Sequence, residues 1–369
     1  MSAWIFWLSL ALVAYTYAGY ALLVAALARK RGHTPARSDA TPPLTVVIAA
    51  YNEVTLIAQR VRNILDQDYP AQNLHVLVID DGSDDGSARA ADIGDARVRV
   101  LTLPQRGGKA AALNVAMAEV TTPYVAFGDA RQQFARDALR RLVAPFAEPR
   151  VGAVAGELEL GASGHVGLYW KMERRLRADE ARLGWLHGVS GAIYALRTAL
   201  FRPLPRGILL DDLWIPLHVV FAGYRVWFAR DAIAWDTSIE NAAVEYRRKL
   251  RTLAGNWQLL ARLPRLLLPW RNPVFFAWVS HKLSRLIAPW CLLALWVTSL
   301  LAEGALYRFA FWAQTIAYAV AALMLLAPRV GARIPLAATA ASFVVLNTAA
   351  LFSLPAYLAR DQFQLWKKH

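Results

Sequence analysis

Val78-Ile-Asp-Asp-Gly-Ser-Asp-Asp-Gly86 follows directly on the apolar run Leu74-His-Val-Leu77. The run predicts a buried strand, and the adjacent carboxylates of Asp80 and Asp81 stand at its carboxyl end. The glycines and the serine after them favour a sharp turn, which leaves the two carboxylates facing a crevice. Because open α/β sheets bind ligands at the carboxyl ends of their strands, we expect a nucleotide-sized ligand at this place.

The segments around this stretch alternate between strand and helix signals. Apolar runs predict strands over 44–50, 74–79, 98–103 and 124–127, and helical spacing predicts helices over 54–65, 87–91 and 108–120. Such alternation favours an α/β domain with a mainly parallel, Rossmann-like sheet. Three of the strands end in polar residues, Tyr51-Asn-Glu53, Asp80-Asp81 and Asp129. We therefore expect these residues to meet at one edge of the sheet.

Composition places the chain in a membrane. The 369 residues are 57% hydrophobic and have a mean hydropathy of +0.30, which is too apolar for an ordinary soluble enzyme. The net charge of +14 comes from basic residues beside apolar segments, as at 29–31, 262–265 and 282–285. This is the positive-inside pattern, so we expect membrane lipid and no nucleic acid as a partner. The single cysteine, Cys291, excludes an intramolecular disulfide and favours a cytoplasmic catalytic part.

The apolar segments predict the domain boundaries. We expect an N-terminal transmembrane helix over 1–31, a linker over 32–43, a catalytic α/β domain over 44–245, interfacial amphipathic helices over 246–273, and three transmembrane helices with a C-terminal tail over 274–369. Basic residues follow the first helix, which argues against a cleaved signal peptide. Counting segments puts the tail outside, whereas Lys367-Lys368 favours the inside, and Pro355 could return the last segment to the interface. The side of the tail stays open.

Two motifs together resemble a known family. Val46-Val-Ile-Ala-Ala-Tyr-Asn-Glu53 and Ile79-Asp-Asp-Gly-Ser83 look like the nucleotide-binding half of a membrane-bound family 2 glycosyltransferase with the GT-A fold, similar to bacterial exopolysaccharide, cellulose and hyaluronan synthases. The resemblance covers about 44–262. It implies an inverting enzyme of the inner membrane that uses a nucleoside diphosphate sugar, with UDP as the expected nucleotide. The sugar would be moved to a growing cell-surface polysaccharide or a lipid-linked acceptor at the cytoplasmic face.

The resemblance also assigns a donor site. Tyr51, Glu53 and Asp81 would hold the base and ribose, with Asp80 beside them, and Lys109 would contact the diphosphate from a helix start, where backbone N–H groups and a cation favour phosphate. Each residue also has a structural interpretation. Glu53 could cap the following helix, Asp80 and Asp81 could form a turn, and Lys109 could be solvated at the surface.

Asp129-Ala-Arg131 stands at the place of the family's Asp-X-Asp metal motif. Its first carboxylate is present and its second is an arginine. Divalent ions take several oxygen ligands, donor phosphates among them, so Asp129 could still hold Mg²⁺ or Mn²⁺. Alternatively, Arg131 itself neutralises the diphosphate.

Asp211-Asp212 resembles the acidic pair that supplies the base. Asp212 would take the proton of the acceptor hydroxyl and Asp211 would shape the site. Two acids that cap a helix are the structural alternative. Arg247-Arg-Lys-Leu-Arg251 stands at the Gln-X-X-Arg-Trp signature of processive synthases, with Arg248 in place of Gln and Thr252 in place of Trp. Arg251 would stabilise the leaving diphosphate, while the altered signature weakens the case for processive synthesis.

The acceptor site is expected at His187, Ser190 and Gly191, with Trp185 and Trp214 as rings beside it. The preceding helical stretch, Tyr169 to Arg175, is expected to expose its charged face to solvent. Two other functions stay open, namely single addition to a polyprenyl-phosphate lipid and a non-catalytic nucleotide-binding scaffold. Product export could require partner proteins or a homo-oligomer. The sugar itself is not determined, because discrimination rests on a few hydroxyl contacts from loops.

Overall fold

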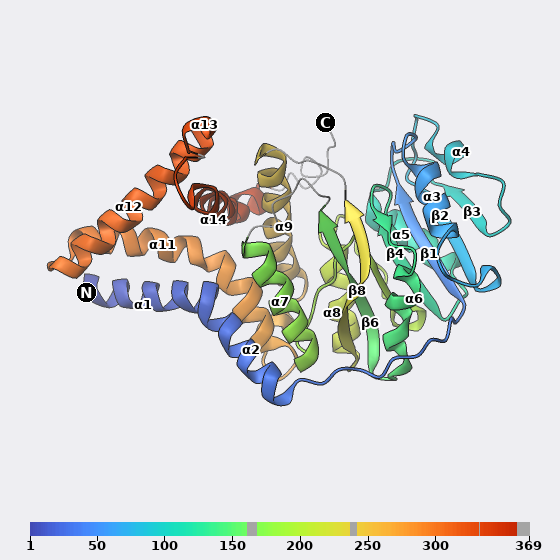
Figure 1. Ribbon diagram of the computed structural model, residues 1–369, viewed down its shortest axis with the longest axis horizontal. Coiled ribbons are helices and arrows are strands. Elements are labelled where there is room, and N and C mark those ends of the chain that lie inside the picture. The colour runs from blue at the N-terminus through green and yellow to red at the C-terminus, as the bar shows by residue number, and fades with distance from the viewer. Residues whose placement is uncertain (161–167, 237–241, 332, 360–369) are drawn as a thin grey trace.

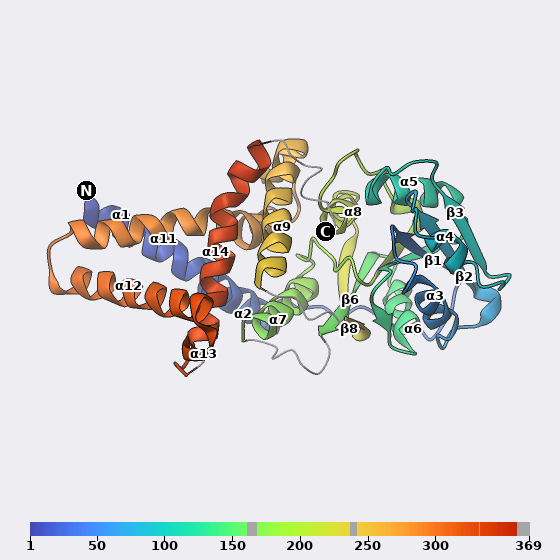
Figure 2. The same cartoon turned by 90° about the horizontal axis from the view of Figure 1, so that it is seen from above.

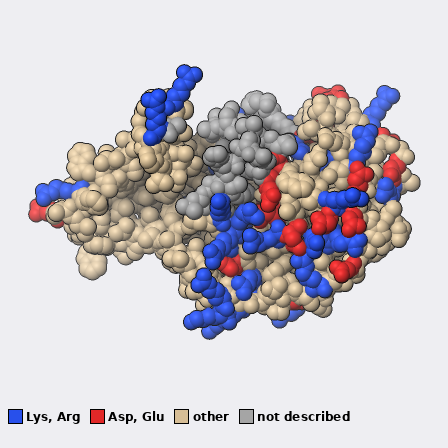
Figure 3. Space-filling model, viewed as in Figure 1, with Lys and Arg blue, Asp and Glu red and all other residues tan. Residues whose placement is uncertain are grey.

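The computed structural model of the protein describes residues 1–160, 168–236, 242–331 and 333–359. The tail over 360–369, whose side the sequence left open, lies outside the described residues. Figure 1 shows an α/β domain beside a group of long helices that carries the N-terminus at its far end. Charged side chains gather on the α/β domain and along its border with the helices (Figure 3).

Within the described residues the central sheet has eight strands, in the order β3-β2-β1-β4-β7-β6-β8-β5. The strands are β1 Leu44–Ala50, β2 Leu74–Asp80, β3 Val98–Thr102, β4 Tyr124–Asp129, β5 Gln133–Phe134, β6 Val151–Leu160, β7 Tyr194–Arg197 and β8 Arg225–Asp236. The pairs β1–β2, β1–β4, β2–β3 and β6–β8 are parallel, and β4–β7, β6–β7 and β5–β8 are antiparallel. The α/β prediction is confirmed. Its parallel character applies to the first four strands, and the sheet becomes mixed beyond them.

Helices cover both faces of this sheet. They are α3 Ile57–Leu65, α4 Ser87–Ala91, α5 Lys109–Glu119, α6 Ala138–Val143 and α8 Asp211–Phe221, with short 3-10 turns at Ala71–Asn73, Ala144–Ala147, Thr198–Leu200 and Pro264–Leu267. In β1, Val46 and Ile48 pack in one core with α3 and α6, while Val47 packs in the other with α5 and α8. A strand that is buried on both faces needs a continuous apolar sequence, which is why 44–50 shows no polar alternation.

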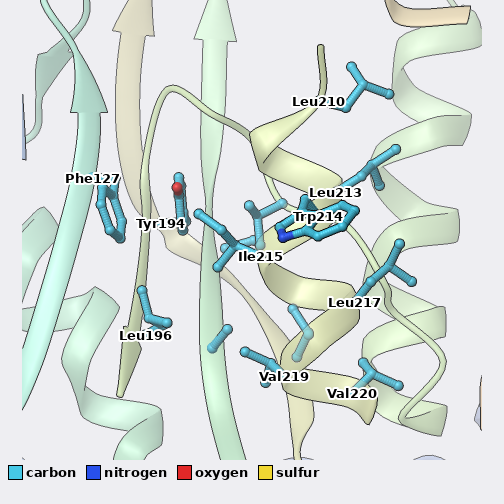
Figure 4. Packing of buried hydrophobic residues seen from close by; sticks show 14 of the residues in the cluster. Phe127, Tyr194, Leu196, Leu210, Leu213, Trp214, Ile215, Leu217, Val219 and Val220 are labelled. Carbon is cyan, nitrogen blue, oxygen red and sulfur yellow. The ribbon is translucent and has the colours of Figure 1, made fainter. Parts of the chain in front are cut away.

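The core beneath α8 is dense (Figure 4). Ile215 and Val219 extend from α8 toward the sheet, where the rings of Phe127 on β4 and Tyr194 on β7 stack with their centroids 4.8 Å apart. Leu213, Leu217 and Val220 extend from the other side of the helix. This core fixes the N-terminus of α8, where two carboxylates stand, relative to the end of β4.

Four helices among the described residues are long and apolar enough to cross a membrane. The first, Ser2–Arg31, comprises α1 Ser2–Ala14, a π-helical turn η1 Tyr15–Gly19 and α2 Tyr20–Arg31. The second, Phe275–Leu301, comprises α10 Phe275–Trp278, a π-helical turn η6 Val279–Leu283 and α11 Ser284–Leu301. The others are α12 Ala305–Leu326 and α14 Ala337–Leu358, which a short α13 Pro328–Gly331 separates.

The fourth apolar helix lies across the others. In Figures 1 and 2 the helices α1, α11 and α12 run beside one another away from the α/β domain, whereas α14 crosses them and lies along α9 Ala242–Arg262. Trp257 Nε1 on α9 donates to Ser353 Oγ on α14 at 3.0 Å. The Tyr17 hydroxyl donates to Asn347 Oδ1 on α14 at 2.7 Å. Polar bonds therefore hold α14 at the base of the helical group.

A buried charge network joins the α/β domain to the membrane helices. His281, on the π-helical turn η6, places Nδ1 and Nε2 each 2.8 Å from the carboxylates of Glu180 and Glu173 on α7 Leu168–Leu183. Arg285 donates to Glu173 Oε2 and the Tyr20 hydroxyl to Glu180 Oε1, both at 2.8 Å. Burial opposes ionisation of Glu173, yet Arg285 and His281 hold its pKa well below the ordinary value. The prediction that the charged face of this helix is solvated is wrong at Glu173, because Glu173 binds His281 and Arg285 inside the protein.

Candidate active site

The end of β4 and the starts of α5 and α8 meet at the carboxyl edge of the sheet. Asp129 ends β4, Lys109 begins α5, and Asp211 begins α8. The Lys109 ammonium bridges the two acids, with Nζ 3.0 Å from Asp129 Oδ1 and 3.1 Å from Asp211 Oδ2. Burial disfavours the charged amine, but the carboxylates of Asp129 and Asp211 outweigh it and raise the pKa of Lys109. Lys109 is therefore a fixed cation at the place where a diphosphate is expected.

Asp81 holds the turn that presents Lys109. Its Oδ1 accepts from the N–H groups of Gly107 and Gly108 at 2.7 and 3.0 Å, and Oδ2 accepts from Gly108 at 2.8 Å. Gly108 has φ +83°, a conformation that favours glycine. Burial raises the pKa of Asp81, and the two glycine N–H groups act in the opposite direction. In this structure Asp81 is 4% exposed and positions the glycine turn, so a direct contact with the nucleoside would require it to exchange partners.

The other predicted donor residues surround that turn. Asp80 is buried and accepts from the backbone N–H and the hydroxyl of Ser83, so it forms the turn that the structural alternative foresaw. The guanidinium of Arg106 lies 4.1 Å from the centre of the Tyr51 ring. Glu53 is half-buried next to it, and its backbone N–H donates to Ser87 Oγ. Arg106 was absent from the sequence prediction, although it directly precedes Gly107 and Gly108.

Asp212 has the properties of a base. Burial and the neighbouring Asp211 raise its pKa to about 6, against the opposing charges of Lys109, Lys282 and Arg251. Its backbone carbonyl accepts from Val189 N–H at 2.9 Å, which ties the start of α8 to the 187–191 segment. A methyl group added at Gly191 would lie 3.6 Å from Lys109 Nζ and 3.8 Å from Asp212 Cβ. Glycine at this position keeps the approach to both groups open.

A cavity of about 680 Å³ begins at Asp212 and extends toward the membrane helices. His187, Ser190 and Gly191 line it, as predicted for the acceptor site. His187 Nδ1–H donates to the Trp185 carbonyl at 3.0 Å, and burial lowers its pKa to about 4, so the ring is neutral at pH 7. Its Nε2 is a buried acceptor without a hydrogen bond in the part of the chain that the structure describes.

Both predicted acceptor tryptophans lie elsewhere. Trp214 points into the core from α8 and packs 4.6 Å from the His218 ring, so its expected contact with the acceptor is corrected to a structural role (Figure 4). Trp185 packs edge to face on Phe276 at 5.5 Å and does not line the cavity. Trp214 shares the buried side of α8 with Leu213 and Leu217. This apolar helical spacing is visible in the sequence and would have predicted a buried ring.

Asp129 and Arg131 differ in exposure and in contacts. Asp129 keeps 41% of its side chain exposed beside Lys109, whereas Arg131 is exposed at the surface. No group of three metal-ligating side chains occurs among the described residues. A divalent ion between the domain and a diphosphate would use the Asp129 carboxylate as its protein ligand, and phosphate oxygens would complete its coordination shell. On α9, Arg248 and Arg251 are half-buried, and Arg251 is near enough to Asp212 to lower its pKa.

The mixed sheet with its nucleotide-type crevice defines the GT-A fold. A mannosyltransferase from Pyrobaculum calidifontis, solved in complex with GDP-Man and Mn²⁺, superposes with a TM-score of 0.74 at 23% identity, over 96% of this chain and 99% of that one. Residues 45–204 match the sequence profile of Glycosyl transferase family 2. The chain thus contains a family 2 glycosyltransferase domain.

Sequence relatives are glycosyltransferases as well. The N-acetylglucosaminyltransferase of Rhizobium meliloti is 28% identical over 241 residues, which are 59% of this chain and 56% of that protein. The β-monoglucosyldiacylglycerol synthase of Trichormus variabilis is 31% identical over 144 residues, which are 38% of this chain and 31% of that protein. The chain spans about half the length of the N-acetylglucosaminyltransferases that it matches.

Proposed function

We propose that the protein transfers a sugar, with inversion, from a nucleoside diphosphate to an acceptor hydroxyl at the cytoplasmic face of the inner membrane. The observation that carries this proposal is the meeting of Lys109, Asp129 and Asp211 beside Asp212, whose pKa is raised to about 6. A fixed cation suits the diphosphate, and a carboxylate with a pKa near the working pH suits proton removal.

The transfer step follows from this arrangement. The acceptor hydroxyl gives its proton to the Asp212 carboxylate while its oxygen attacks the anomeric carbon from the face opposite the diphosphate. The bond between that carbon and the diphosphate oxygen breaks, and the electron pair leaves with the nucleoside diphosphate. Lys109 and Arg251 offset the charge that develops on the leaving group, which is an electrostatic contribution of the oxyanion-hole kind.

The donor site is proposed from both residues and relatives. Tyr51, Glu53 and Asp81 lie after β1 and β2, where nucleosides bind in such sheets. We favour UDP as the carrier. The relatives named N-acetylglucosaminyltransferase and glucosyldiacylglycerol synthase support a hexose-type sugar, and their names leave both a glycan and a lipid acceptor open. Whether addition is single or processive is part of the same question, since the altered 247–251 segment departs from the processive signature.

A divalent ion is proposed at Asp129. The similar mannosyltransferase structure contains Mn²⁺ with its nucleotide sugar, which supports Mg²⁺ or Mn²⁺ here. Bound there, the ion would neutralise the phosphates. Lys109 already supplies one positive charge at this carboxylate, so the protein can hold part of the diphosphate by itself.

A screen of labelled nucleotide sugars on membranes that contain the full chain tests the proposal. We expect one donor to release its nucleoside diphosphate and to label an organic-solvent extract or a polymer, and release should fall on addition of EDTA. Unchanged turnover in EDTA would refute the proposed divalent ion at Asp129. Absence of release with every donor would leave only a nucleotide-binding scaffold.

A further inference from the structure

The cavity behind Asp212 has a charged half and an apolar half. Its charged half faces α7 and the π-helical turn η6, with Arg177 and Lys282 among its lining residues. Its apolar half is closed by α14, which contributes Ala338, Ser342, Leu346 and Ala350. These four follow one another at intervals of four residues, so they form one stripe along the helix. The cavity therefore connects the candidate base with a surface inside the membrane region.

Two cations of the charged half make no close ion pair. The carboxylates of Glu173 and Glu180 attract Lys282, and that of Glu157 attracts Arg177, only from farther away. The carboxylates there are already engaged, since Glu173 and Glu180 bind His281 and Glu157 lies 3.0 Å from Arg174. Lys282 makes no hydrogen bond and no ion pair within 4.0 Å among the residues that the structure describes. The same holds for Arg177, whose guanidinium lies 4.7 Å from the Phe228 ring centre and whose Nη2 is buried without a partner.

Two unpaired like charges at one cavity are costly unless an anion joins them. A buried charge that lacks a partner costs several kcal/mol, so such groups normally mark a ligand site. Lys282 and Arg177 line the same cavity as Asp212, so an anion bound to them shares this cavity with the candidate base. The π-helical turn that carries Lys282 interrupts an apolar helix, as such turns commonly do at functional sites.

We propose that this cavity binds a membrane lipid that carries a phosphate group and serves as the acceptor, or as the anchor of the acceptor, of the transfer proposed above. The phosphate lies against Arg177 and Lys282, and the hydrocarbon chain lies along the apolar stripe of α14. A neutral polysaccharide end needs neither the two cations nor the apolar stripe. Because this inference rests on the proposed function, its test measures binding without any donor.

The experiment uses the full chain in detergent micelles and three probes, namely a polyprenyl monophosphate, the polyprenol of the same length, and inorganic phosphate. Binding is followed by the shift of the melting temperature and by tryptophan fluorescence. We expect the lipid phosphate to bind and the other two probes to leave both signals unchanged at the same concentration. Equal binding of the polyprenol, or saturation by inorganic phosphate alone, would overturn the proposal.

Variants locate the phosphate. Lys282→Gln and Arg177→Gln should each weaken binding of the polyprenyl monophosphate by about 10- to 100-fold, because each removes a charge-assisted hydrogen bond. Lys282→Arg should retain most of the affinity. Arg175→Gln, on the exposed side of the same helix as Arg177, is the matched control and should bind like the wild type. Wild-type affinity in both glutamine variants would refute the site, and the comparison of probes on the wild type decides even where a variant fails to fold.

The outcomes separate the two proposals. Lipid-phosphate binding without transfer from any nucleotide sugar would contradict the proposed function and leave the cavity assignment standing. Transfer to an acceptor that lacks phosphate, at rates that Lys282→Gln leaves unchanged, would contradict the cavity assignment and leave the glycosyltransferase standing.

Discussion

At the scale of single residues, the proposed chemistry depends on the charges of Lys109 and Asp212. Lys109 pairs with acids from β4 and α8, and Asp212 stands in the field of Asp211, which raises its pKa. The two adjacent acids at the start of α8 thus differ, since Asp211 pairs with the cation and Asp212 is the one for which we propose the role of proton acceptor. Both acids stand in the first turn of α8, where negative charge is favoured, and the residue at the N-cap position is Leu210.

The raised pKa predicts how activity depends on pH. Asp212 acts as a base only when ionised, so kcat/KM should fall as the pH drops through about 6. Asp211→Asn removes a negative charge that raises the pKa of Asp212, and the acid limb of the profile should therefore move to lower pH. Initial rates from about pH 5 to 8 measure both effects. An acid limb that stays in place in Asp211→Asn would contradict the coupling of the two acids.

Sequence reasoning reached some of these residues and missed others for definite reasons. Asp129 was named because it ends a strand, and parallel strands bring their carboxyl ends together. Lys109 was named at a helix start after two glycines, and Asp211 through the resemblance to the family's acidic pair. Arg177 and Lys282 were missed, because only the tertiary structure shows that their carboxylate neighbours are engaged elsewhere. The one signal for Lys282 was an ionisable residue inside an apolar segment, which had been attributed to the positive-inside pattern.

At the scale of elements, the turn over 107–108 connects β3 to α5 along the chain and is hydrogen-bonded to the residue that follows β2. Asp81 at the end of β2 fixes this turn through two backbone N–H groups, and the turn in turn places Lys109 at the first position of α5. The stretch over 78–86 therefore acts on the proposed diphosphate site indirectly, through the glycine turn and Lys109.

Asp81→Asn tests this connection. The amide has one acceptor oxygen and would bring an NH₂ group against N–H donors, so the variant should lose about 1–3 kcal/mol of stability. Displacement of Lys109 should also weaken nucleoside diphosphate binding. Chemical denaturation and calorimetric titration measure the two effects. Asp137→Asn, at a surface pair with Arg141, is the control and should change neither. Full stability with unaltered nucleotide affinity would show that Asp81 does not hold the turn.

The elements themselves were predicted unevenly. The strand over 44–50 has the predicted bounds and α4 begins at Ser87 as predicted, because burial on both faces and a glycine turn leave clear local signals. The second half of the sheet was not foreseen. β7 pairs with both β4 and β6, and such pairings between distant segments are selected by tertiary packing that no local pattern records.

At the scale of the whole molecule, the length of α14 does not by itself determine whether the helix crosses the membrane. It is as long and apolar as a membrane-spanning helix, yet it crosses α11 and α12 and lies along α9 (Figure 2). We propose that the catalytic domain is cytoplasmic, that three helices cross the bilayer, and that α14 lies in the cytoplasmic interface as a wall of the cavity. The bend that Pro355 suggested is unnecessary, because the whole helix already lies across the others.

Cysteine labelling checks this topology. In a Cys291→Ser background, Glu303→Cys between α11 and α12 should react with a membrane-impermeant thiol reagent in intact cells. Ala359→Cys at the end of α14 should react only after the membrane is opened. Both positions are exposed in the structure. Labelling of Ala359→Cys in intact cells would mean that α14 crosses the bilayer.

The central claim is that Asp212 removes the proton from an acceptor hydroxyl beside a bound sugar donor. Release of nucleoside diphosphate by Asp212→Asn, compared with its affinity for the same donor, tests this claim most directly. We predict that turnover falls about 100-fold or more while donor affinity and melting temperature stay at wild-type values. Turnover by Asp212→Asn at the wild-type rate would contradict the account.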